Sequence, residues 1–63
     1  DDSDPSFLDT LATALAAGGE FAAAVETADR ALALAVEQGD ESLARDIGVR
    51  RALFASGHPF VGR

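Results

Sequence analysis

The chain has 63 residues, with eleven acidic and five basic side chains, a formal charge of -6 at pH 7 and no cysteine. Without cysteine it has neither disulfides nor thiolate metal sites. The charge and the absence of lysine argue against nucleic-acid binding, because phosphate contacts need clustered Lys and Arg. Charged residues interrupt every apolar run well short of the ~20 residues that span a bilayer, and the N-terminus is acidic, so we expect neither a membrane span nor a signal peptide. We expect a soluble protein. Its compartment is left open by the composition, with the cytoplasm as the default.

The first helix is expected over residues 5–17. Asp1–Asp4 form an acidic segment without apolar side chains, which predicts a flexible lead-in over residues 1–4. Asp4 followed by Pro5 is typical of a helix start, because the carboxylate can cap backbone N–H groups and proline fits the first turn. The apolar residues then recur at i, i+3, i+4 and i+7, which places them on one helix face: Leu8, Leu11, Ala12 and Leu15.

A second helix is expected from Glu20 to about Gln38, after a turn at Gly18 and Gly19. One of these glycines should adopt the left-handed conformation that ends a helix. One broad sector of the second helix collects its apolar residues, namely Phe21, Ala24, Val25, Ala28, Ala31, Leu32, Ala35 and Val36. Since alanine lets helix axes approach closely, this pattern predicts a tightly packed hairpin, with Leu32 lying against Leu11 and Leu15.

Residues 5–38 resemble a tetratricopeptide repeat, a 34-residue helix-turn-helix unit that is usually found in arrays. That family has large residues around a Leu-Gly or Leu-Ala pair in the first helix, Gly-x-Phe/Tyr at the turn, and spaced small or aromatic residues in the second helix. The matching positions here are Leu8, Leu11, Ala12, Leu15, Gly19, Phe21, Ala24, Ala28, Ala31 and Leu32. Ala28 and Val36 depart from the pattern, since the family often has an aromatic residue and a proline there. The resemblance implies an all-α fold with one repeat over residues 5–38.

A third helix is expected to follow, within residues 39–57. Gly39 ends the second helix, Asp40 is placed to cap the third, and Gly57 with Pro59 ends it near Ser56. Leu43, Ile47 and Phe54 form one apolar stripe that suits packing against the second helix, and the sequence departs from a further repeat, so we interpret this element as a capping helix. The tail, residues 58–63, is expected to fold back so that Phe60 covers the end of the core.

The sequence offers no catalytic, metal or cofactor site that we would assign. His58 lies in a Gly-His-Pro turn without a second histidine or a cysteine at metal-ligand spacing. Glu26, Glu37 and Glu41 lie on predicted polar faces, with nothing nearby to shift a pKa. Gly18-Gly19 is not a phosphate loop, because no strand precedes it and no Lys-Ser/Thr follows. We therefore expect a protein without enzymatic activity and without a cofactor.

The resemblance implies a peptide-binding surface on the first helix. Arrays of this family bind extended peptides along a concave surface, and the corresponding residues here are Ser6, Asp9, Thr13, Ala16 and Ala17. Members that grip a terminal carboxylate place Asn and Lys at such positions, so a carboxylate-ended ligand would meet repulsion from Asp9 here. The alternative is that these side chains are simply solvated.

Three functions stay open on the sequence. The first is a protein or peptide interaction module, a scaffold element at the C-terminal end of a longer array. The second is an accessory domain of an enzyme such as a glycosyltransferase, a setting in which such repeats occur. The third is a structural unit that self-associates as a symmetric dimer, because repeats bury their apolar faces against neighbours. The surface expected to assemble it comprises Phe7, Ala14, Val49 and Leu53, although isolated exposed apolar residues are also common.

Overall fold

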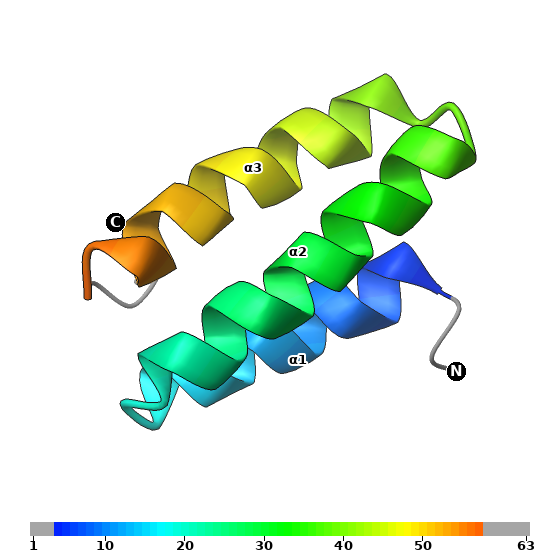
Figure 1. The fold of residues 1–63 in the computed structure, drawn as a ribbon. Helices are drawn as coiled ribbons and strands as arrows, with labels where there is room; N and C mark the ends of the chain where they lie inside the picture. Colours follow the sequence, from blue (N-terminus) through cyan, green and yellow to red (C-terminus); the bar gives the residue numbers. More distant parts are fainter. Residues whose placement is uncertain (1–3, 58–63) are drawn as a thin grey trace.

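The computed structural model describes residues 4–57, which fold into three α-helices. These are α1 (Pro5–Ala17), α2 (Phe21–Glu37) and α3 (Glu41–Ala55). Successive helices run antiparallel, and α2 packs against both α1 and α3 (Figure 1). The predicted all-α fold, a helical hairpin followed by a third helix, is confirmed. The expectations for Asp1–Ser3, His58 and Phe60 fall outside the described residues.

The predicted helix starts at Asp4 and Asp40 are confirmed. The Asp4 Oδ1 atom accepts a hydrogen bond from the Ser6 backbone N–H at 2.9 Å, and Pro5 occupies the first helical position. The Asp40 Oδ1 atom accepts from the Leu43 N–H at 3.1 Å. Glu20 has non-helical backbone angles and is the N-cap of α2, so the helix begins at Phe21 rather than at Glu20, and the Glu20 side chain makes no capping bond. Asp side chains thus fix the start of two of the three helices.

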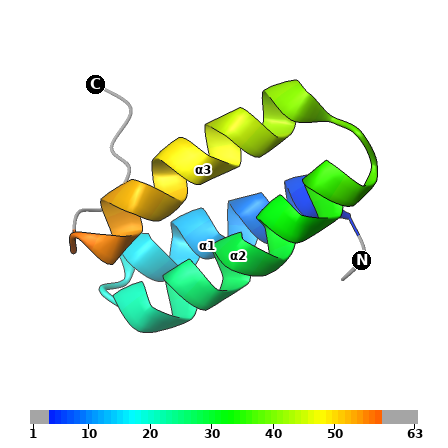
Figure 2. The same ribbon diagram turned by 45° about the horizontal axis from the view of Figure 1, so that its top comes forward.

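Both helix connections use a glycine in the left-handed region. Gly19 has φ 86° and Gly39 has φ 75°, and each is followed after one residue by the next helix. Beyond these glycines, the Glu20 N–H donates to the Leu15 carbonyl and the Asp40 N–H donates to the Ala35 carbonyl, both at 2.9 Å. These bonds satisfy carbonyls that the helix ends would otherwise leave unpaired. Because successive helices run antiparallel, the two turns lie at opposite ends of the three-helix unit (Figure 2).

Alanine dominates the buried core. Two thirds of the fully buried apolar residues there are alanine, and the set is Leu8, Ala12, Ala16, Ala24, Ala28, Ala31, Ala35, Ile47 and Phe54. Alanines on both α1 and α2 face this core, which allows the two helices to approach closely, as the sequence pattern predicts. Ile47 and Phe54 bring α3 onto α2, so the predicted packing of the third helix against the second is also confirmed.

Two residues assigned to the apolar faces lie at the surface. Leu11 is 40% exposed and Val36 is 64% exposed, so their predicted burial was wrong. Because α1 packs mainly against one helix, its covered stripe is narrow, with Pro5, Leu8, Ala12 and Ala16, and Leu11 lies beside it. Leu15 and Leu32 are partly buried against the core, but Leu11 does not join them. In the described part of the chain, no helix is long and apolar enough to cross a membrane.

Candidate functional site

An open groove of about 460 Å³ lies between α1 and α3. These two helices touch each other far less than either touches α2, so side chains of both remain accessible on this side of the molecule. The lining combines small, hydroxyl and charged residues: Asp9, Thr10, Thr13, Ala14, Ala17 and Arg50. We call this feature the α1–α3 groove. Five of its lining residues come from successive turns of α1 and one comes from α3.

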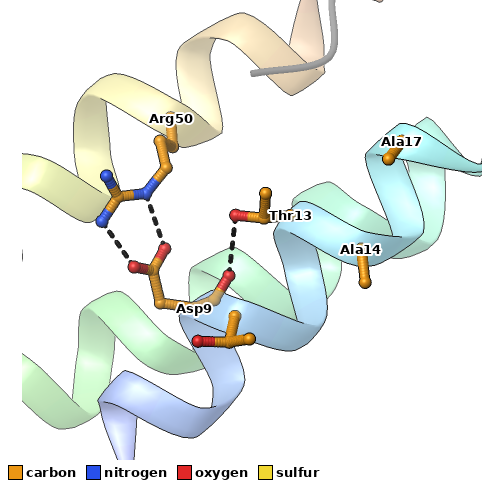
Figure 3. Close-up of a pocket in the computed structure, with 6 residues that line it drawn as sticks. Asp9, Thr13, Ala14, Ala17 and Arg50 are labelled. Atoms are coloured by element: carbon orange, nitrogen blue, oxygen red, sulfur yellow. Dashed lines mark hydrogen bonds and ion pairs between the residues drawn. The ribbon is translucent and has the colours of Figure 1, made fainter. Parts of the chain in front are cut away.

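A two-pronged ion pair between Asp9 and Arg50 joins the two walls of the groove (Figure 3). The Arg50 Nε–H donates to Asp9 Oδ1 at 2.8 Å, and Arg50 Nη2 donates to Asp9 Oδ2. The side chains of Arg50 and Asp9 are only 21% and 14% exposed. The hydrogen bonding of Arg50 to the Asp9 carboxylate raises the pKa of Arg50, against the opposing effect of burial, and the negative charges of Asp9 and Asp46 raise it further. The guanidinium therefore stays charged, and this planar pairing fixes how α3 lies against α1.

The two threonines of the groove direct their hydroxyl protons into the helix. Thr10 Oγ1 donates to the Ser6 carbonyl at 3.0 Å. Thr13 Oγ1 donates to the Asp9 carbonyl, also at 3.0 Å (Figure 3). A hydroxyl has one proton and two lone pairs, so each oxygen keeps the capacity to accept a hydrogen bond from outside. The α1 wall thus offers acceptors at Thr10 and Thr13, followed towards the end of the helix by the methyl groups of Ala14 and Ala17.

The structure brings together three of the five residues expected to bind a peptide. Asp9, Thr13 and Ala17 line the α1–α3 groove. Ser6 is exposed on α1, one turn before Thr10, but does not line the groove. Ala16 is buried in the core, so placing it on the binding surface was wrong. The reason is its register: Ala16 lies eight residues after Leu8, on the stripe that packs against α2.

The residues expected to support self-association have different environments. Phe7 is 46% exposed and Val49 is 59% exposed, which leaves a large apolar side chain accessible on each of α1 and α3. Ala14 is exposed and lines the α1–α3 groove together with the peptide-binding candidates. Leu53 is only partly buried on α3. The set is therefore distributed over more than one surface.

The groove residue that the sequence does not reveal is Arg50. It lies three residues after Ile47 and four before Phe54, so its position beside a buried stripe was a usable signal of partial burial. The sequence carried no signal for the identity of its partner, because Asp9 is 41 residues away in the sequence. On the other flank of α3, Arg51 pairs with Asp29 of α2, but both side chains are well exposed and such a pair contributes little.

The carboxylates considered for acid-base chemistry are exposed. Glu26, Glu37 and Glu41 all lie at the surface. Among residues 4–57, no group of three or more His, Cys, Asp or Glu side chains is arranged to hold a metal ion. Every buried side-chain nitrogen or oxygen in this range has a hydrogen-bond partner. The α1–α3 groove is the candidate site that the described residues offer.

Comparisons with known proteins return no matching family model, no matching curated protein and no matching solved structure. The likeness to tetratricopeptide repeats consequently rests on the residue pattern of 5–38 alone.

Proposed function

We propose that this chain is a non-catalytic protein interaction module, a unit of a longer tetratricopeptide-like array, which binds an extended peptide segment in the α1–α3 groove. The observation that carries the proposal is the groove itself, which stays open between two helices that are both packed on α2. Its position coincides with the surface that the family resemblance implies, through Asp9, Thr13 and Ala17.

The chemistry of the lining suits a peptide ligand. Ala14 and Ala17 present only methyl groups, so a partner backbone can approach α1 closely at these positions. Thr10 and Thr13 supply oxygen atoms that accept hydrogen bonds from partner N–H groups. A polar segment followed by a small apolar one provides both orientation and close contact.

The proposal is tested by titrating the isotope-labelled chain with unstructured peptides of varied sequence and recording amide chemical shifts. Binding should shift the amides of Asp9, Thr13 and Ala17. Ala14→Gln places a longer side chain in the groove and should abolish the response, whereas the matched Ala33→Gln on the exposed face of α2 should leave it unchanged. If no peptide moves Asp9 and Thr13, or if Ala14→Gln binds as the parent does, the groove is not a peptide site.

A second candidate function is self-association as a symmetric dimer. Phe7 and Val49 favour it, because each is a large apolar side chain that is about half exposed in a chain with a small core. A twofold arrangement covers the same patch twice. Light scattering at about 100 μM protein, where micromolar affinities are near saturation, should give a dimer mass. Phe7→Lys combined with Val49→Lys should restore a monomer, and a monomeric parent chain at this concentration would exclude self-association.

A further inference from the structure

We infer that the α1–α3 groove selects a basic peptide segment, one that carries lysine or arginine at spaced positions. This inference deepens the proposed function, on which it rests, by naming the chemistry of the partner. It follows from three properties of the groove: the charges beside it, the direction of its hydroxyl protons, and the polarity of the helix ends at one side.

Among the described residues, the charged groups that line the groove or lie beside it have a negative balance. Two carboxylates, Asp9 and Asp46, accompany one guanidinium, Arg50, and Asp46 lies one turn before Arg50 on α3. Each Asp9 oxygen accepts one hydrogen bond from Arg50, and a carboxylate oxygen has two lone pairs, so Asp9 can still accept from a ligand. Asp46 is exposed beside this pair. A cation entering the groove therefore meets carboxylate oxygens that still accept hydrogen bonds.

The neutral part of the α1 wall offers acceptors and no side-chain donor. Thr10 and Thr13 have committed their hydroxyl protons to the Ser6 and Asp9 carbonyls. Lysine and arginine side chains carry only donors, three and five respectively, and thus match such a wall. A glutamate or aspartate side chain, which only accepts when ionised, finds no donor on these two threonines.

Helix polarity adds to the same preference. Because α1 and α3 run in the same direction, their C-terminal ends lie at the same end of the molecule (Figures 1 and 2). Neither helix has a basic residue in its last turn to offset the negative end of its dipole. Each such end acts as roughly half a negative charge, so together they outweigh the single positive end of α2 that starts nearby. The Ala17 end of the groove is therefore favourable for a cation.

An acidic segment is disfavoured on the same grounds. To pair with Arg50, its carboxylate would have to displace Asp9 and give up both charge-assisted hydrogen bonds of the existing pair. It would also approach Asp46 and a chain with a formal charge of -6. Electrostatic complementarity of this kind decides between partners more than it sets total affinity.

The test uses three blocked octapeptides in which alanine alternates with lysine, with glutamine or with glutamate. The labelled chain is titrated with each peptide, and amide shifts are recorded at low and at high salt. The lysine peptide should shift the amides of Thr10, Thr13 and Ala17, and its affinity should fall as salt screens the charges. The glutamine and glutamate peptides should bind at least about tenfold more weakly than the lysine peptide.

A pair of charge-removing variants separates the groove from the overall charge of the chain. Asp46→Asn should weaken binding of the lysine peptide about threefold, the effect of one partly exposed ion pair. Glu26→Gln removes the same charge from the exposed face of α2 and should change nothing. Equal weakening by both variants would show attraction to net charge alone and overturn the inference.

The remaining outcomes distinguish this inference from the proposed function. If the glutamine or glutamate peptide shifts the groove amides more strongly than the lysine peptide, the basic preference is wrong and the groove remains a peptide site. If none of the three peptides shifts Thr10, Thr13 or Ala17, the inference fails. If, in addition, Ala14→Gln leaves the binding of every other peptide unchanged, the proposed function fails with it.

Discussion

Replacement of Ala28 by leucine tests whether the helices are held together by close contact of alanines. Ala28 is completely buried, and so are Ala24, Ala31 and Ala35 on the same helix. Leucine adds three carbon atoms at a position where the neighbouring helices leave no space for them. Overpacking of this kind costs about 1–3 kcal/mol. A chain of 63 residues has a free energy of unfolding of only about 3–9 kcal/mol, so the loss is a substantial part of it.

Urea unfolding followed by circular dichroism measures this loss. With a slope of about 1 kcal/mol per molar urea for so small a protein, the midpoint of Ala28→Leu should fall by about 1–3 M. The control is Ala33→Leu, which makes the same change on the exposed side of α2 and alters helix propensity by only ~0.2 kcal/mol. A midpoint for Ala28→Leu at or above that of the parent, with an unchanged slope, would refute the close-packing argument.

Two further predictions concern the backbone and the ion pair. Gly39→Ala should lower the free energy of unfolding by about 1 kcal/mol because φ is +75°. Gly48→Ala should raise it by about 0.5–1 kcal/mol because that glycine is helical and an added Cβ would lie in open space. Urea midpoints that move in the same direction for both variants would contradict this. A double-mutant cycle of Asp9→Asn and Arg50→Gln should give a coupling of about 1–2 kcal/mol, since both side chains are mostly buried. A coupling near zero would mean that the pair does not hold α1 and α3 together.

Local signals in the sequence predicted most of the fold. Asp4, Asp40 and the glycines 19 and 39 act within a few residues of themselves, so the helix ends differ from expectation by no more than about one residue. The failures at Leu11 and Val36 have another origin. Helical periodicity gives the direction of an apolar face but not its width, and the width depends on how many neighbours the helix has. Since α1 packs mainly on α2, its covered stripe is narrow.

The candidate site was predicted only in part, for a related reason. The resemblance to a tetratricopeptide repeat placed Asp9, Thr13 and Ala17 on one surface of α1, and all three line the α1–α3 groove. Ala16 was misplaced because a groove-lining position and a core position are adjacent in the sequence at the end of α1. The place of Arg50 in the groove depends on a contact between residues that are 41 positions apart in the sequence. No local pattern encodes which acidic residue will face it.

The central position of α2 has a consequence for how the chain folds. Nearly all helix contacts join elements that are neighbours in the sequence, α1 with α2 and α2 with α3, through turns of three residues. Loop closure is therefore inexpensive, and a topology this local belongs to the class that folds in microseconds to milliseconds. Either hairpin can form first, but both nucleation routes require α2. Destabilising substitutions in α2 should slow folding by both routes, whereas those confined to α3 leave the α1–α2 route intact.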